Sequence, residues 1–147
     1  VRLGEIIRIS SGDGLSSRNM VKGDIPVFGG NGITGYHNKA NVYKETIVIG
    51  RVGYYCGSVH VTPSQAWITD NAFITQYTEK YIDRDYLVLM LRFMNLGRSN
   101  NATAQPVVSG KKIYPRLFPL PPLAEQRRIV AKLEELLPLC QQLASHP

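Results

Sequence analysis

The sequence predicts an α+β fold: a compact, mostly β body with one or more short helices, followed by an amphipathic, coiled-coil-like C-terminal helix. With 147 residues, of which 44% are hydrophobic, the chain is long enough for one core. Short runs of β-branched residues alternate with Gly- and Asn-containing turns, which is typical of strands. Only two segments, around Leu87 and after Leu123, carry the three-and-four spacing of apolar residues that indicates a helix.

The first half of the chain is expected to supply most of the strands. Leu3–Ile9 ("LGEIIRI") predicts a short strand or a helical turn. The segment 25–37 ("IPVFGGNGITGYH") predicts two extended runs around Asn31-Gly32, a strong tight-turn signal. The β-branched run Ile47–Ile49 is the clearest strand candidate, and "AWITDNAFITQYT" (66–78) predicts a strand pair or a bent strand.

Glycines follow the run Ile47–Ile49 at Gly50, Gly53 and Gly57. Glycine inside a strand pattern indicates a bend or a close approach of another backbone. We therefore expect this stretch to leave the sheet and lie against neighbouring segments.

One internal helix is expected between Asp83 and about Leu96. Asp83 can cap its N-terminus, and Gly97 is a natural stop. Apolar residues recur on one face, at Leu87, Met90, Leu91 and Met94. The segment 107–123 ("VVSGKKIYPRLFPLPPL") predicts an extended, proline-rich return.

The closing helix follows Pro121-Pro122 and extends from Leu123 to Leu137, where Pro138 predicts a kink or a break. Apolar residues alternate in steps of three and four along a heptad-like seam, which we define as Val130, Leu133, Leu137 and Cys140. Two interpretations remain open: the seam packs on the body of the same chain, or it docks on a partner.

The net charge of +6 suggests a polyanionic partner, although a solvated basic face would look the same. No acidic residue occurs from Tyr86 to Ala124, whereas Leu117 to the end carries three basic and three acidic residues. The positive field therefore belongs to the body, where the acid-free stretch contains Arg92, Arg98, Lys111, Lys112 and Arg116.

The end of the chain carries a more specific pattern. The segment 105–140, with the core "PLPPLAEQRRIV" (Pro119–Val130), closely resembles the end of a target recognition domain and the start of the spacer helix in specificity (S) subunits of type I restriction–modification systems. The segments "LGEIIRISSG", "IPVFGGNGITGYHN", "IVIGRVGYYCGSVHV" and "TDNAF" fit the same family. The resemblance covers about Leu3 to Leu143.

The resemblance implies a non-catalytic subunit. In this family two recognition domains, each followed by a long helix, read the halves of a split double-stranded DNA target. The helices pair antiparallel as a ruler, DNA methyltransferase (M) subunits hold them, and a motor–nuclease subunit completes the complex. Here we expect a DNA target recognition domain over 1–119 and the first part of the spacer helix over 120–147. With a single domain, no initiator Met and a helix ending at Pro147, the chain is expected to be a fragment, a truncated gene product or a half-subunit, and a half-subunit could form a homodimer through its helix.

DNA recognition needs Lys and Arg for phosphates and adaptable polar side chains for base edges. The polar loop "RSNNATAQP" (98–106), just before Lys111 and Lys112, is the main candidate, with solvated loops as the alternative. The expected DNA-binding residues are Arg18, Asn31, Lys39, Arg51, Tyr54, Arg98, Ser99, Asn100, Asn101, Gln105, Lys111 and Lys112. The expected helix interface comprises Leu123, Gln126, Ile129, Val130, Leu133, Leu136 and Leu137.

Other functions fit less well. "FGGNG" (28–32) matches a methyl-donor loop of adenine methyltransferases, but turn-rich sequence follows it and the companion motif is absent. Two cysteines and scattered carboxylates predict neither a metal site nor a cofactor. With no leader and no apolar run longer than Leu87–Leu91, we expect a cytoplasmic protein with no membrane partner. The competing hypotheses are an S fragment that binds the methyltransferase without reading DNA, and a domain excised from a fused type II-like enzyme.

Overall fold

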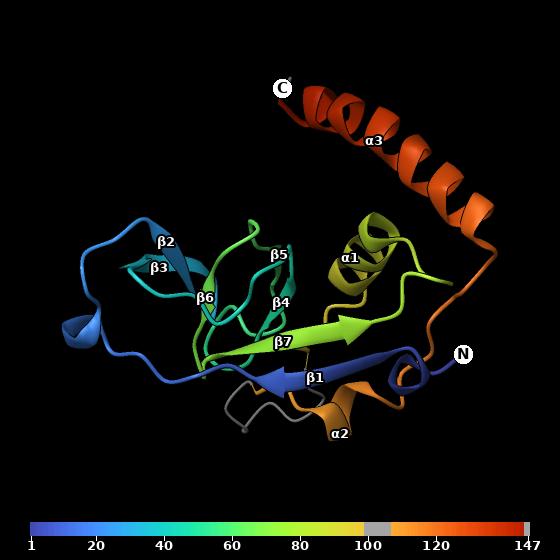
Figure 1. Cartoon of the computed structure of the whole chain (residues 1–147). Helices are drawn as coiled ribbons and strands as arrows, with labels where there is room; N and C mark the ends of the chain where they lie inside the picture. The colour runs from blue at the N-terminus through green and yellow to red at the C-terminus, as the bar shows by residue number, and fades with distance from the viewer. Residues whose placement is uncertain (99–106, 146–147) are drawn as a thin grey trace.

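The computed structural model describes residues 1–98 and 107–145. Its elements are η1 (Leu3–Glu5), β1 (Ile7–Ser11), η2 (Ser17–Asn19), β2 (Ile25–Gly29), β3 (Gly32–His37), β4 (Ile47–Gly50), β5 (Val59–Val61), β6 (Trp67–Ile68), β7 (Ala72–Tyr77), α1 (Arg84–Phe93), α2 (Gly110–Ile113) and α3 (Leu123–Ser145), where η marks a 3-10 helix. The predicted α+β class is confirmed: a strand-rich body is followed by a long helix that extends away from it (Figure 1).

The strands form two sheets. The first has the order β1-β7-β4-β5 and is antiparallel throughout. The second has the order β3-β2-β6, with β2 antiparallel to β3 and parallel to β6. The predicted β2–β3 hairpin is present, but it turns at Gly30-Asn31, one residue before the predicted Asn31-Gly32, and Gly32 adopts a positive φ of 82° as the first residue of β3.

Strand β4 is buried on both faces, which explains its unbroken apolar run. Ile47 and Ile49 belong to the core that includes α1, whereas Val48 belongs to a second core together with Phe28 of the other sheet. Successive side chains on a strand point to opposite faces. A single strand therefore joins the helix layer to the second sheet.

Helix α1 begins as predicted but ends earlier. The Asp83 carboxylate accepts a hydrogen bond from Tyr86 N at 3.0 Å, which caps the first turn. The helix ends at Phe93 rather than near Leu96, because Asn95 adopts the left-handed conformation expected of Gly97. Gly97 serves close packing instead, since a Cβ there would clash with the Cys56 carbonyl oxygen.

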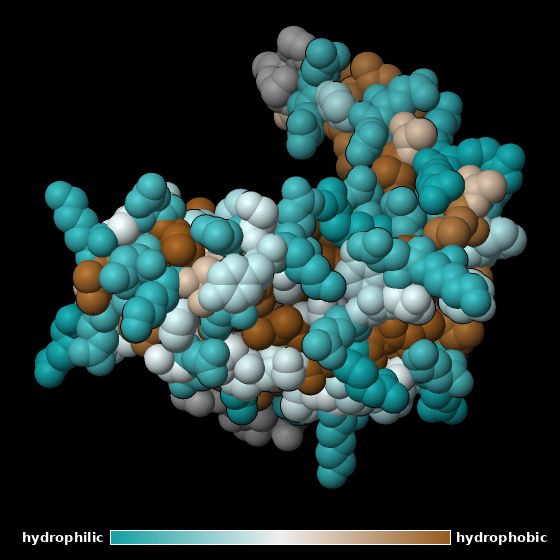
Figure 2. Space-filling view, viewed as in Figure 1, coloured by the Kyte–Doolittle hydropathy of each residue, from teal (hydrophilic) through white to brown (hydrophobic). Residues whose placement is uncertain are grey.

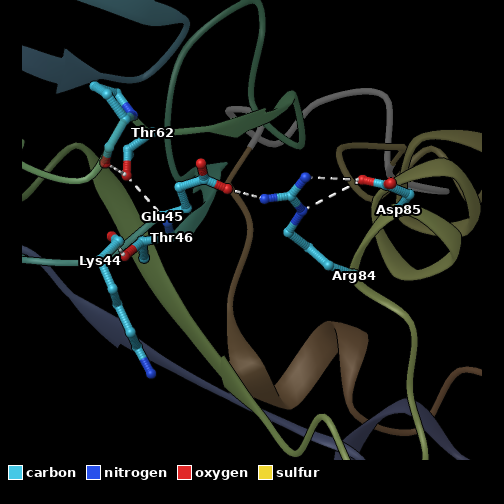
Figure 3. A network of polar contacts seen from close by, with 7 residues as sticks. Lys44, Glu45, Thr46, Thr62, Arg84 and Asp85 are labelled. Carbon is cyan, nitrogen blue, oxygen red and sulfur yellow. Dashed lines mark hydrogen bonds and ion pairs between the residues drawn. The ribbon is translucent and has the colours of Figure 1, made fainter.

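Polar contacts fix the start of β4 to its surroundings (Figure 3). Arg84, at the start of α1, pairs with Glu45 and, at 3.2 Å, with Asp85. Thr46 N donates to Thr62 Oγ1 at 3.0 Å, which ties the segment before β4 to the one after β5. The Arg84–Glu45 ion pair therefore connects the start of α1 to the segment before β4.

The last forty residues contradict the wholly extended return segment and a break of the closing helix at Pro138. The return segment is not wholly extended, because Ser109 caps the short helix α2 through a 3.3 Å hydrogen bond from Lys112 N. Helix α3 does not break at Pro138 but continues to Ser145. Pro138 is exposed, so solvent can bind the carbonyl group that proline leaves without a helical partner. Within residues 1–98 and 107–145, no helix is long and apolar enough to cross a bilayer.

Candidate nucleic-acid interface

Several connections meet around the β4–β5 loop (residues 51–58). We call the loop end the region formed by this loop together with the β2–β3 turn, the β6–β7 turn and the residues Gly97 and Val108 that contact the loop. Arg51 N donates to Asn71 O at 2.9 Å, which joins the loop to the β6–β7 turn. Ser58 Oγ donates to Gly30 O at 2.9 Å, which joins it to the β2–β3 turn. Val108 N donates to Arg51 O at 2.8 Å.

Glycines make this convergence possible. A Cβ on Gly50 would clash with the Gly30 carbonyl oxygen, and a Cβ on Gly57 would clash with the Gly97 backbone nitrogen. The prediction of close backbone approach at these glycines is therefore confirmed. Because Gly97 and Val108 both contact the β4–β5 loop, the two segments that flank residues 99–106 are anchored at the loop end.

Four of the predicted DNA-binding residues lie at or beside the loop end. Asn31 is exposed in the β2–β3 turn, and Tyr54 is exposed in the β4–β5 loop. Arg98 is exposed and follows Gly97. Arg51 is half-buried: Nη1 donates to Ser11 Oγ at 3.2 Å and to Asp70 O at 3.5 Å, and the guanidinium lies over the Phe73 ring. Arg51 is thus partly committed to contacts within the chain.

The other predicted basic residues are distributed more widely. Lys111 and Lys112 are exposed on α2, and Lys112 Nζ donates to Val107 O at 3.1 Å, which links α2 to the flank of the loop end. Arg18 lies in η2, on the β1–β2 connection that projects from the body (Figure 1). Lys39 follows the Ile25–His37 pair, at the opposite end of the β2–β3 hairpin from Asn31. The structure therefore does not gather all predicted DNA contacts on one face.

The remaining predicted DNA contacts, Ser99, Asn100, Asn101 and Gln105, lie outside the described residues.

Two residues of the predicted helix interface belong to the interior of the chain instead. Gln126 has an exposed fraction of 0%, and Val130 is buried in the main core. The Gln126 side chain accepts a hydrogen bond from Asp83 N at 2.9 Å and donates to Tyr81 O and Pro121 O, both at 2.8 Å. These residues fasten α3 to the body, so they are not available to a partner.

The other residues of the predicted helix interface are distributed along α3 and are less buried than Gln126 and Val130. Leu123, Ile129 and Leu133 are half-buried, whereas Leu136 and Leu137 are each 41% exposed. Exposed apolar residues continue to Leu143, at 75%. Figure 2 shows hydrophobic residues along α3 beyond its contact with the body. Packing on the body therefore applies to the first part of the helix, and docking on a partner stays a prediction for the exposed part.

His60 and Arg92 line a pocket together with Gly32 and Ile33 of β3. Burial, together with the positive charge of Arg92, lowers the pKa of His60. His60 is therefore mainly neutral at pH 7. Within the described part of the chain, no group of three or more His, Cys, Asp or Glu residues could hold a metal ion.

Comparison with known proteins identifies the family to which this arrangement belongs. Residues 1–144 match the model of the type I restriction modification DNA specificity domain. The chain belongs to this family. Its resemblance to type I specificity subunits is thus confirmed, and specificity subunits are the non-catalytic members of their systems.

Two curated relatives from Escherichia coli are type I specificity subunits. The chain is 31% identical to the EcoprrI specificity subunit over 138 residues, which is 90% of this chain and 34% of the relative. It is 34% identical to the EcoAI specificity subunit over 73 residues, which is 50% of this chain and 11% of the relative. The chain therefore spans about a third or less of these relatives.

Two solved structures share the fold over 99% of this chain. The S subunit from M. genitalium has a TM-score of 0.75 at 17% identity, with 40% of that chain covered. The HsdS subunit from Thermoanaerobacter tengcongensis has a TM-score of 0.70 at 26% identity, with 38% covered. The chain thus corresponds to one DNA specificity domain, and the family match includes most of α3.

Proposed function

We propose that this specificity domain reads one half of a split double-stranded DNA target through its loop end. The observation that carries the proposal is the convergence of Asn31, Arg51, Tyr54 and Arg98 on one region, with both flanks of the polar segment 99–106 anchored there. These residues come from separate parts of the sequence. A binding surface built from loops on a rigid scaffold is the usual arrangement for recognition.

In this proposal, charged side chains bind the DNA backbone and polar side chains read the bases. Arg98, Lys111 and Lys112 bind phosphates, which supplies most of the affinity and makes it salt-dependent. Amide and hydroxyl side chains at Asn31 and in the segment 99–106 read base edges in the major groove. Residues at a distance from the loop end, Arg18 and Lys39, contact the DNA backbone if the duplex extends past the second sheet.

The exposed part of α3 serves assembly. Leu133, Leu136 and Leu137 bind a methyltransferase subunit and the helix of a second recognition unit, which in this chain is provided by a homodimer. A motor–nuclease subunit joins the full complex, in the cytoplasm. In this proposal the division between residues 1–119 and 120–147 separates DNA recognition from assembly, with the first two turns of α3 serving as the joint.

A second candidate function is methyltransferase binding without DNA recognition, and the exposed leucines of α3 are the observation that favours it. A fragment that retains this helix could bind the methyltransferase and no longer read DNA. Because the two functions use different surfaces, substitutions in α2 distinguish them.

Reversing the charges of Lys111 and Lys112 to Glu is expected to weaken DNA binding and to leave methyltransferase binding unchanged. The slope of log affinity against log salt is negative, and each lost phosphate contact reduces its magnitude by about 0.9. The magnitude of the slope should therefore be smaller by about 2 in the double variant. Fluorescence anisotropy with labelled duplex over a salt series measures both the slope and the affinity.

The matched control reverses Lys44 and Lys80, two exposed residues away from α2, with the same change in net charge. This control should reduce the magnitude of the slope by clearly less than the Lys111/Lys112 variant does. Equal effects of the two double variants would show that only net charge matters, which would contradict a localised DNA surface.

A further inference from the structure

We propose that Tyr54 and Tyr55 form an aromatic wedge that stacks on DNA bases and unstacks one base step when the domain binds. The inference rests on the proposed function, because it assumes that the loop end faces DNA. It assigns to the β4–β5 loop a role in deforming the duplex, distinct from phosphate binding and from hydrogen bonding to base edges.

The two rings lie together on the surface, and Tyr54 has the largest exposed fraction of the large hydrophobic residues in the described part of the chain. Tyr54 is 90% exposed and Tyr55 is 58% exposed. Their ring centroids lie 5.0 Å apart at an interplanar angle of 84°, which is an edge-to-face pair. Aromatic side chains are usually buried for their large apolar area, so a paired exposed arrangement indicates a surface that is covered during function.

The loop that carries the rings is folded on itself. Gly53 and Gly57 bracket the pair with positive φ values of 95° and 85°, which favour glycine. Cys56 N donates to Gly53 O at 3.1 Å, Gly57 N to Gly50 O at 2.8 Å and Ser58 N to Tyr55 O at 3.1 Å. A Cβ on Gly53 would meet no atom within 4 Å, so this side of the tip faces open space.

The base of the loop is firmly seated. Gly57 packs directly against Gly97, and Val52 forms an antiparallel bridge with Val107. Arg51 N and O are both bonded to neighbouring segments. The rings therefore project from a braced support, and little order has to be gained when a ligand is bound.

The charge around the loop favours DNA over a protein partner. No acidic residue occurs from Thr46 to Thr69 or from Tyr86 to Ala124. Arg51 stands at the base of the loop, and Arg98 follows the glycine on which the loop packs. One carboxylate, Asp70, lies in the neighbouring turn, where Arg51 donates to its backbone carbonyl. An apolar tip flanked by arginines fits a duplex, because side chains that enter a base step need cations to hold the adjacent phosphates.

Wedge insertion depends on how easily the step opens. Pyrimidine–purine steps such as TA and CA unstack most readily, so the wedge should prefer them without any hydrogen bond to the bases. The hydroxyl groups of the two tyrosines are not required for stacking. Phenylalanine at both positions should therefore preserve the activity, whereas alanine should remove it.

The test uses duplexes enriched by the full chain from a random pool, with 2-aminopurine substituted for single adenines. Binding of the unmodified chain should raise the fluorescence of 2-aminopurine at one pyrimidine–purine step. The variant Tyr54→Ala/Tyr55→Ala should lose this rise and bind about ten-fold to a hundred-fold more weakly, as loss of base stacking predicts. Tyr54→Phe/Tyr55→Phe should retain both properties.

Tyr43→Ala/Tyr81→Ala is the matched control, since both tyrosines are exposed and lie outside the loop end. It should change neither fluorescence nor affinity. Thermal unfolding checks that each variant folds, and the fluorescence of the unmodified complex tests the wedge without any variant.

The possible failures are distinguishable. Selective binding without a fluorescence rise, and unaffected by the alanine pair, would overturn the wedge and leave the proposed function intact. Absence of selective DNA binding by the unmodified chain would overturn both. An alanine pair that keeps DNA affinity but loses methyltransferase binding would identify the tyrosines as a protein-docking surface and overturn the wedge.

Discussion

Replacing Gln126 with leucine is expected to destabilise the protein by about 3 kcal/mol or more. Leucine has a similar volume but cannot replace the hydrogen bonds to Asp83 N, Tyr81 O and Pro121 O. Each buried polar group left without a partner costs about 1–3 kcal/mol. Because these bonds join α3 to the N-terminus of α1, hydrogen exchange should show the first turns of α3 losing protection before the sheets. Urea denaturation followed by circular dichroism measures the loss of stability.

The matched control is Gln141→Leu, in the exposed part of the same helix, which should change stability by no more than about 0.5 kcal/mol. Gln126→Glu adds a pH test. The buried carboxylate would face two carbonyl oxygens, so its pKa should be higher in the folded than in the unfolded state. This variant should therefore lose stability as the pH rises above about 4.3, the unfolded value. A Gln126→Leu variant as stable as the unmodified chain would contradict the assignment of Gln126 as the joint.

Replacing Leu133 and Leu137 with Asp is expected to abolish self-association and methyltransferase binding while the body stays folded. Leu137 is 41% exposed, and both residues lie beyond Val130, where α3 packs on the body. Charges in a helix–helix seam would be buried without partners, which is strongly unfavourable. In the monomer position 137 is exposed and position 133 is only half-buried, so charges there keep contact with water and the body should stay folded. Analytical ultracentrifugation and pull-down with the methyltransferase subunit measure the two losses.

The control Ala131→Asp/Gln141→Asp adds the same charge outside the seam and should leave association intact. Unfolding of the body by Leu133→Asp/Leu137→Asp would contradict the proposal, because it would mean that these leucines pack on their own domain. Val130→Asp is the positive control for unfolding, because Val130 is buried in the core.

Much of the fold could be predicted from local sequence. The β-branched run Ile47–Ile49, the β2–β3 hairpin and the Asp83 cap each depend on a few neighbouring residues, so each leaves a recognisable pattern, although the hairpin turn lies one residue earlier than predicted. Helix α2 was missed because four residues are too few to show helical periodicity. The sequence alone does not show that the helix continues through Pro138, because the cost of a proline depends on whether the freed carbonyl meets solvent, which is a property of the tertiary structure.

The candidate site was only partly predictable for the same reason. Residue types indicated Asn31, Arg51, Tyr54 and Arg98 individually, but their convergence depends on close backbone contacts at Gly50, Gly57 and Gly97. Amphipathic spacing could not divide α3 into a docked and an exposed part. No sequence signal indicates that the polar residue Gln126 is buried. Its three hydrogen-bond partners are the Asp83 N–H and the Tyr81 and Pro121 carbonyl groups, which only the tertiary structure brings together around it.

The most direct test of the account is selection of duplexes from a random DNA pool with this chain at low and at moderate salt. If the loop end reads DNA, one motif of a few base pairs should be enriched at both salt concentrations, and it should recur as an inverted pair at fixed spacing if α3 forms a dimer. Binding without sequence preference that disappears as salt is added would mean that only phosphate contacts operate. That result would contradict DNA reading by the loop end.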